Sequence, residues 1–400
     1  MKTFFQKIQI DYRKGMHVPA LDGIRGAGMI TVMLYHFFTF PYGAWFSMDS
    51  FFVLSGFLIT GILLDTKTNK HYFKNYIARR MLRILPLYYG VLIVFFLVVP
   101  LFASKQALAD FSVYYQNQSY FWAYLQNWVL LANEQNLKGS GRIFLHLWSL
   151  AVEEQFYIVW PLIVLLFNRR NLTRIILLLI FFSIGLKCYY FFSGHSWQYT
   201  YFNTFARTDT LCIGALIAIA VRSSTVIPTL EKAVPYIFKI LFVVLTAALL
   251  LFRPHAPSNQ FMEPFGTTIF AIFFAALILY CLSTSQNSFT KRLLESKMLR
   301  FFGKYSYAMY IFHVPVLALL RPGMVVFFHK YMGNSSAFLL ANFFCLAFTL
   351  IAGQISWYLI EKPALKLKRF FSYETKQPVI NYQTEFTAHK NESFTIENTK

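Results

Sequence analysis

Charged residues are scarce in this 400-residue chain, since Asp, Glu, Lys and Arg make up 14% of it whereas 57% is hydrophobic. A soluble protein of this length needs a polar outer surface, so the composition argues against a soluble domain. Apolar residues recur in windows of about twenty, the length at which an α-helix crosses a bilayer. These windows are continuous rather than alternating, which argues against a transmembrane β-barrel. We therefore predict an all-α, polytopic transmembrane helical bundle.

Acidic residues are fewer than basic ones, 17 against 37, and the formal net charge is +20. The basic residues cluster at the ends of apolar windows, which is the positive-inside pattern of membrane proteins, so we expect no nucleic-acid partner. The chain has only four cysteines, scattered within apolar runs without paired spacing: Cys188, Cys212, Cys281 and Cys345. They indicate neither a disulfide framework nor a metal site. We also identify no cleaved signal peptide at the N-terminus.

Ten windows are predicted to span the membrane, near residues 23–41, 46–64, 84–102, 144–167, 172–193, 204–221, 236–253, 264–283, 303–320 and 337–360. The alternate connections rich in Lys and Arg fall on one side, which predicts that both termini are cytoplasmic. Residues 1–17 are expected to form a cytoplasmic segment, 18–371 the membrane domain and 372–400 a disordered cytoplasmic tail. The long outer connection 103–143 is expected to be functional or to carry an interfacial helix.

Arg25 and His36 stand eleven residues apart in the first span. Eleven steps of about 100° bring His36 to within roughly 20° of Arg25, about 16 Å further along the helix. Ionisable residues inside a membrane are costly and usually mark a functional site. We expect Arg25 near the cytoplasmic end and His36 in the outer half. The alternative is a structural histidine between helices, with Arg25 extending to the interface.

The fourth span carries polar residues in its outer half: Trp148, Ser149, Glu153, Glu154 and Tyr157. Glu153 and Tyr157 share one helical stripe with His146, whereas Glu154 is turned about 100° away. Two adjacent carboxylates are expensive in a membrane helix, which indicates function. The alternative is that a carboxylate pairs with a cation of another span and only holds helices together.

Arginines occur at two further places. Arg80 and Arg83 stand one helical turn apart at the cytoplasmic mouth of the third span, where they could hold a phosphate group bidentately. Alternatively, they only follow the positive-inside rule. At the outer start of the sixth span, Arg207 and Asp209 are interpreted as forming an inter-helix ion pair rather than as catalysts.

The last two spans carry the remaining candidates. Ser306, Tyr310 and His313 lie at i, i+4 and i+7 of the ninth span and form one polar stripe. His313 is a second intramembrane histidine, for which a structural role is the alternative. In the last span, Glu361 is expected to form a helix-ending ion pair, because Pro363 limits the helix.

Five motifs in this order resemble the integral-membrane acyltransferase family called acyltransferase 3, over about residues 18–368. They are Arg25 with His36, the Arg-x-x-Arg of Arg80 and Arg83, the block Trp148 to Tyr157, the block Gly303 to Pro315, and Glu361-Lys362-Pro363. The resemblance implies transfer of an acyl group, by default acetyl, to a hydroxyl of an extracytoplasmic glycan or lipid-linked sugar. The implied donor substrate is cytoplasmic acyl-CoA, and no cofactor is bound permanently.

The resemblance also implies residue roles: Arg80 and Arg83 hold the coenzyme phosphates, and His36 serves the acyl-transfer step. Some members carry an extracytoplasmic serine-hydrolase-like domain after the membrane part, and this chain is expected to be a stand-alone member without it. Its expected location is the plasma membrane, as a multi-pass protein.

Acyl transfer to a hydroxyl needs a base for the alcohol proton and a polar site for the oxyanion. We hypothesise that His36 is that base, directly or through a transient acyl-imidazole, and that Glu153 orients it. The thioester would reach His36 past Arg25. The main rival is a multi-span carrier or flippase for a lipid-linked glycan or anionic solute, whose path the same charges would line. A degenerate member that acts as an assembly partner is a third possibility. The acceptor, the acyl chain and the oligomeric state stay open.

Overall fold

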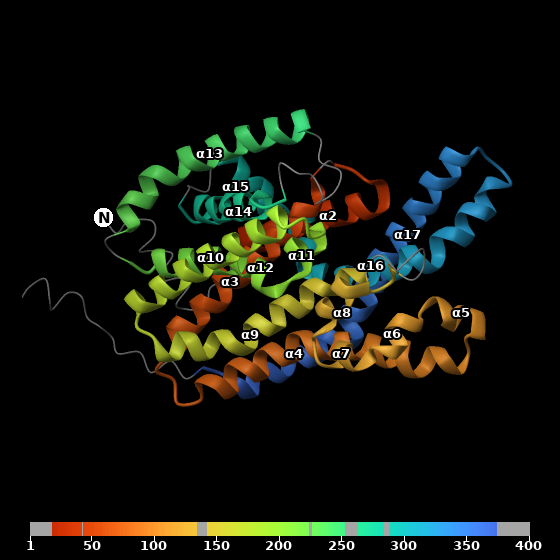
Figure 1. Cartoon of the computed structure of the whole chain (residues 1–400), viewed down its shortest axis with the longest axis horizontal. Helices are drawn as coiled ribbons and strands as arrows, with labels where there is room; N and C mark the ends of the chain where they lie inside the picture. The colour runs from red at the N-terminus through yellow and green to blue at the C-terminus, as the bar shows by residue number, and fades with distance from the viewer. Residues whose placement is uncertain are drawn as a thin grey trace, which may run out of the picture.

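The structure is a computed structural model that describes residues 18–41, 43–133, 142–223, 226–252, 263–283 and 288–373. Helices connected by turns make up these residues, and no β-strand occurs among them (Figure 1). Eight of the helices are long and apolar enough to cross a membrane, as judged by length and composition. The predicted all-α membrane bundle is therefore confirmed. The predicted N-terminal segment and nearly all of the predicted tail lie outside the described residues.

Every predicted span falls on a long helix. These are α2 (Pro19–Phe38), α3 (Ser47–Thr66), α4 (Tyr72–Ile93), α9 (Trp148–Leu166), α10 (Arg169–Phe192), α12 (Thr204–Ala220), α13 (Ile227–Phe252), α14 (Gly266–Ser283), α16 (Lys297–His329) and α17 (Asn334–Ser356). Helices α2 and α12 are not among the eight, because α12 has only 17 residues and α2 contains Asp22, Arg25 and His36.

Four helices extend well beyond their predicted spans, among them α13, which begins at Ile227 rather than near 236. Helix α4 begins at Tyr72 rather than near 84, so its arginines lie inside the helix. Helix α16 continues to His329, which places Arg321 within it rather than in an outer loop. Pro363 does not end the last helix, since a π-helical turn (Trp357–Glu361) leads into α18 (Lys362–Lys366) and a 3₁₀ turn to Phe371. The wider π turn accommodates the proline at the first turn of α18, where its missing N–H is tolerated.

Polar side chains fix where several helices begin. The Asn203 side chain accepts hydrogen bonds from the N–H groups of Phe205 and Ala206 at the start of α12. Ser296 does the same for the Leu299 N–H of α16. Each satisfies a first-turn donor that has no partner within the helix. These caps set the starting points of two helices that carry candidate site residues.

Glycines allow two pairs of helices to approach closely. A Cβ atom on Gly303 of α16 would lie 2.0 Å from the Asp22 carbonyl oxygen of α2, and one on Gly56 of α3 would lie 1.9 Å from the Leu211 carbonyl oxygen of α12. No larger residue fits without moving a backbone, as in many membrane helix pairs. The α2–α16 and α3–α12 contacts form the centre of the bundle.

The described residues of the connection 103–143 carry four short helices, which confirms the expectation of helical structure there: α5 (Lys105–Asp110), α6 (Ser112–Gln116), α7 (Gln118–Trp122) and α8 (Gln126–Asn133). In Figure 1 they gather at one end of the bundle. The hydroxyls of Tyr88 and Tyr89 on α4 donate to the Phe121 and Trp122 carbonyl oxygens, at 2.8 and 3.0 Å. These bonds attach the connection to the membrane helices.

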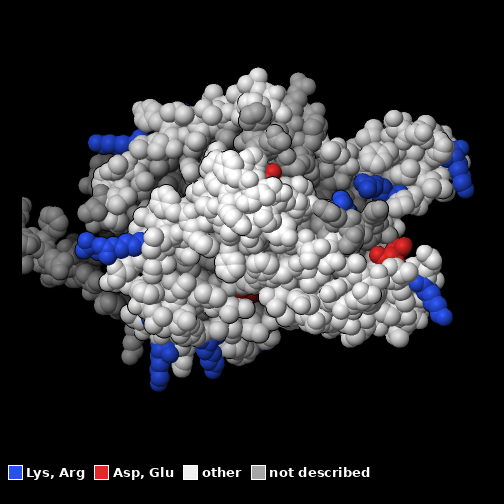
Figure 2. Space-filling view, viewed as in Figure 1, with Lys and Arg blue, Asp and Glu red and all other residues white. Residues whose placement is uncertain are grey.

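The outside of the bundle exposes large apolar side chains along its long helices, among them Phe181, Val243, Phe343 and Leu359. In Figure 2 a broad uncharged area covers the middle of the visible face, and Lys and Arg side chains project mainly from its margins. Such an apolar surface suits contact with lipid, in agreement with a multi-pass membrane protein.

Candidate functional site

Three histidines from separate parts of the chain meet inside the bundle. The ring of His36 on α2 lies 4.9 Å from the ring of His313 on α16, measured between centroids, and His313 lies 4.9 Å from His146. His146 belongs to a short 3₁₀ turn before α9. His146 and His313 are buried, whereas His36 is exposed. His36 is therefore the member of the group that a substrate can reach.

The hydrogen bonding of His313 determines which of its nitrogens can accept a proton. Its Nδ1 atom lies 2.7 Å from the carbonyl oxygen of Tyr310. A carbonyl oxygen can only accept, so Nδ1 carries the hydrogen and the Nε2 atom of the neutral ring keeps its lone pair. Among the described residues, nothing forms a hydrogen bond with this buried Nε2 atom. His313 can therefore accept a proton at Nε2.

Tyr310 and Ser149 complete this group. The Tyr310 hydroxyl lies 2.5 Å from the His146 carbonyl oxygen and 2.7 Å from the Ser149 hydroxyl. Ser306, by contrast, donates to the Gly303 carbonyl oxygen of its own helix, 3.0 Å away. Of the stripe predicted on the ninth span, two members thus join the site and Ser306 does not. We call the five residues His36, His146, Ser149, Tyr310 and His313 the histidine cluster.

A second group lies further along α9. Glu153 accepts a hydrogen bond from the Ser55 hydroxyl of α3, 2.6 Å away. The Arg80 guanidinium of α4 lies over the Tyr157 ring, 3.7 Å from its centroid, and its Nε atom is 3.9 Å from Glu154 Oε1. Both carboxylates and Arg80 are partly exposed. We call these five residues, Ser55, Arg80, Glu153, Glu154 and Tyr157, the carboxylate–arginine cluster.

Helix α9 connects the two clusters. Ser149 precedes Glu153 by four residues, or about 6 Å along the axis.

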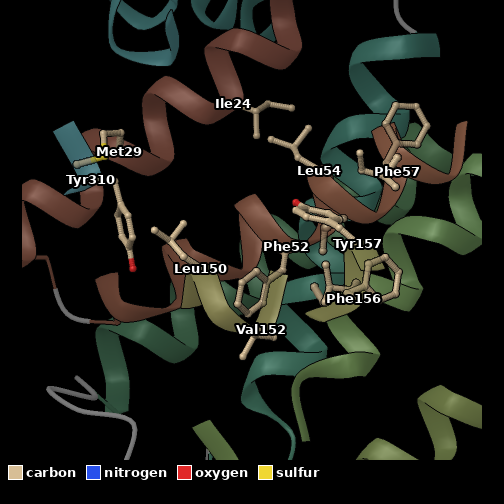
Figure 3. Close-up of a cluster of buried hydrophobic side chains, with 14 of the residues drawn as sticks. Ile24, Met29, Phe52, Leu54, Phe57, Leu150, Val152, Phe156, Tyr157 and Tyr310 are labelled. Atoms are coloured by element: carbon tan, nitrogen blue, oxygen red, sulfur yellow. The ribbon is translucent and has the colours of Figure 1, made fainter. Parts of the chain in front are cut away.

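Arg25 bonds to Asp22 of its own helix at 3.0 Å, and its guanidinium also interacts electrostatically with Glu153. The hydrogen bonds among the described residues include none between Glu153 and His36. The ring that faces His36 is instead that of His313. Figure 3 shows Leu150 and Phe52 in the apolar region between Tyr310 and Tyr157.

Arg83 and Glu361 are two further candidates, and they belong to neither the histidine cluster nor the carboxylate–arginine cluster. The buried Glu361 carboxylate accepts a hydrogen bond from Ser356 at 3.3 Å and interacts electrostatically with Arg83 of α4. The helix continues past Glu361 into α18, so the expected helix-ending ion pair stays a prediction.

Arg207 is part of a fully buried ion pair with Asp49 of α3. Its guanidinium is enclosed by the rings of Phe52, Trp148 and Tyr201, at 5.2, 5.9 and 5.2 Å from their centroids. Trp148 therefore forms a wall of this pair. Among the described residues its ring contacts Phe52, Tyr201 and Phe202, not the rings of the histidine cluster. The interpretation of Arg207 as a partner in an inter-helix ion pair is confirmed.

Asp209 forms the second buried pair. Its carboxylate lies 2.6 Å from the Lys187 ammonium of α10 and accepts hydrogen bonds from Ser183 and Thr268. Lys187 also donates to Thr267 and Thr268 of α14. We call Asp49, Lys187, Arg207 and Asp209 the ion-pair core.

The sequence analysis named no partner for Arg207 or Asp209. It did not identify Asp49 or Lys187 as candidates. The signal was available, because each missed residue is an isolated charge within an apolar window.

Apolar helices with histidines, carboxylates and arginines that converge between them define a multi-pass membrane protein with a candidate catalytic site inside the bundle. Residues 18–357 match the acyltransferase domain of the acyltransferase 3 family, and the chain belongs to this family.

Relatives include YrhL of Bacillus subtilis, which is 30% identical over 390 residues, 91% of this chain and 58% of that protein. The peptidoglycan O-acetyltransferase OatA of Listeria monocytogenes is 30% identical over 322 residues, 76% of this chain and 50% of OatA. The O-acetyltransferase OatA of Staphylococcus aureus is 26% identical over 363 residues, 88% of this chain and 57% of that protein. The chain thus spans about half the length of these relatives. No solved structure matches it.

Proposed function

We propose that this chain transfers an acetyl group from cytoplasmic acetyl-CoA, across the plasma membrane, to a hydroxyl of peptidoglycan on the outer side. The observation that carries the proposal is the exposed His36 ring in contact with His313, whose Nε2 atom is available to accept a proton. Membership of the acyltransferase family supports the reaction class. The acceptor is proposed from the named activity of the Listeria relative.

The proposed reaction uses His36 at the carbonyl carbon of the thioester. In the direct route, the imidazole takes the proton of the acceptor hydroxyl and the alkoxide attacks that carbon. The C–S bond then breaks, and the coenzyme thiolate takes the proton from the imidazolium. In the covalent route, the neutral His36 ring attacks first and the C–S bond breaks, which gives an N-acylimidazolium and the coenzyme thiolate. The acceptor hydroxyl then attacks the acyl carbon and gives its proton to His313 Nε2, and His36 leaves as neutral imidazole. The thiolate finally takes the proton from His313.

In this proposal the carboxylate–arginine cluster serves the donor side. Arg80 and Arg83 would hold phosphate groups of the coenzyme, since guanidinium groups bind phosphate through paired hydrogen bonds. Glu153 accepts a hydrogen bond from Ser55 and lies within electrostatic range of Arg80 and Arg25. Its proposed role is to keep these cations in place along the route of the thioester.

The principal rival is a carrier or flippase for a lipid-linked glycan. A carrier could use the same buried charges, but nothing in transport requires an exposed imidazole beside a second, proton-accepting one. The two functions differ in a direct chemical product, because acyl transfer releases free coenzyme A and transport does not.

The test uses purified full-length protein in lipid nanodiscs, acetyl-labelled acetyl-CoA and soluble peptidoglycan fragments. We expect free coenzyme thiol to appear in step with labelled fragments identified by mass spectrometry. A matched reaction with fragments that already carry acetyl groups controls for hydrolysis of the thioester. Absence of both coenzyme release and labelled product would contradict the proposal. If a different glycan supports coenzyme release and peptidoglycan does not, the proposed acceptor is wrong and the proposed reaction class stands.

A further inference from the structure

The C-terminal strap, residues 362–373, lies against the start of α4. The Asn75 side chain donates to the Ser372 carbonyl oxygen at 2.8 Å, and Arg79 donates to the carbonyl oxygens of Lys368 and Phe371 at 3.2 and 3.3 Å. The Arg79 guanidinium also lies over the Tyr373 ring, 5.3 Å from its centroid. These four contacts fix the strap beside the turn of α4 that carries Arg80 and Arg83.

The strap brings another cation to these arginines. Lys368 is partly buried and interacts electrostatically with Arg79, Arg80 and Arg83, whereas Lys366 on the same strap is exposed. Four cationic side chains thus gather in one place. Of the carboxylates in the described part of the chain, Glu153 and Glu154 interact with Arg80, and Asp22 and Glu361 interact with Arg83. The charges that act on Lys368 are those of the three arginines. Repulsion between like charges that are held this close is costly unless an anion offsets it.

We infer that Lys368 is a further binding residue for a phosphate-bearing ligand, and that the strap completes the anion site begun by Arg80 and Arg83. Arg79 acts as a positioning residue, because its donors are directed to strap carbonyl oxygens. Lys368 follows the segment that matches the family, which ends at residue 357. The inference rests on the proposed function for its ligand, which we take to be the phosphates of coenzyme A.

An ammonium group contributes to phosphate binding as a point charge, and a guanidinium group as a planar fork. Lys368 therefore suits a second phosphate of a ligand whose first phosphate lies between the two arginines. Anionic lipid headgroups carry the same phosphate chemistry and are present in the surrounding bilayer. The experiment must separate these two sources.

Binding of radiolabelled coenzyme A is measured with full-length protein in nanodiscs of zwitterionic lipid. Loss of one charge-assisted contact is expected to weaken the affinity of Lys368→Ala about tenfold. Lys368→Arg, which keeps the cation, should bind as the wild type does. Lys366→Ala removes the same charge from an exposed position of the same strap and should have no effect. The KM for acetyl-CoA should rise in Lys368→Ala while kcat is kept.

Equal affinity of the wild type and Lys368→Ala for coenzyme A would overturn the inference and leave the proposed function standing. Failure of the wild type to bind coenzyme A would overturn the proposed donor, and the inference with it. A second series adds phosphatidylglycerol to the nanodiscs. If this lipid removes the difference between the wild type and Lys368→Ala, the site belongs to a lipid headgroup and the inference is wrong.

Discussion

Two groups of charged or titratable residues lie inside this bundle, and they differ in how completely they are paired. In the ion-pair core, Arg207 and Asp49 are 0% exposed, as are Lys187 and Asp209, and each cation contacts a carboxylate. The histidine cluster contains no ion pair among its described members, and its His36 ring is exposed. Buried charges with matched partners hold helices together, whereas an accessible group with a lone pair can react.

The largest effect should follow from breaking the ion-pair core. Arg207→Met leaves the Asp49 carboxylate buried without its partner, which should destabilise the protein by about 3–5 kcal/mol. Thermal unfolding in detergent should show a large fall in Tm and a low yield of folded protein. The double variant Asp49→Leu with Arg207→Met removes both charges and should recover most of the lost stability. If Arg207→Met unfolds as the wild type does, the ion pair has no structural role.

The next largest effect should follow from changing His313. His313→Gln keeps a polar side chain but removes the Nε2 lone pair, and we expect acyl transfer to fall about 100-fold with Tm nearly unchanged. Ser306→Ala, on the same helix, is the control because its hydroxyl bonds only within α16. Full activity of His313→Gln would remove this residue from the reaction.

A smaller effect is expected at Glu153. Glu153→Gln keeps the shape and an oxygen that can accept from Ser55 but loses the negative charge that acts on Arg80 and Arg25, and should lower acyl transfer about tenfold. Ser55→Ala removes the donor of the hydrogen bond to Glu153. If the bond is what matters, the double variant should be no slower than the slower single variant. Additive losses would indicate that each residue acts alone.

The fold could be predicted largely from the apolar windows, because a bilayer imposes one helix length on all of them. Helix ends were less predictable. The start of α4 is rich in Lys and Arg, and hydropathy places this turn outside the membrane although the chain there is helical. The π turn at Trp357–Glu361 has no recognisable sequence signal, so the proline after it was read as a helix end.

The residues of the candidate site were predicted better than the contacts between them. Periodicity identified the stripe that contains Tyr310 and His313, and it identified Glu153 and Tyr157 on another helix. Which stripe faces His36 depends on the close α2–α16 approach at Gly303, and single-helix periodicity contains no such information. For this reason Glu153 was expected beside His36, where the structure has His313.

The central claim is that His36 carries the acyl group or takes the acceptor proton. Its most direct test is acetyl transfer from labelled acetyl-CoA by purified His36→Ala, in nanodiscs and beside the wild type. We predict a loss of about 1000-fold or more in the rate, with the Tm of the wild type retained. Transfer at the wild-type rate by a correctly folded His36→Ala protein would contradict the account.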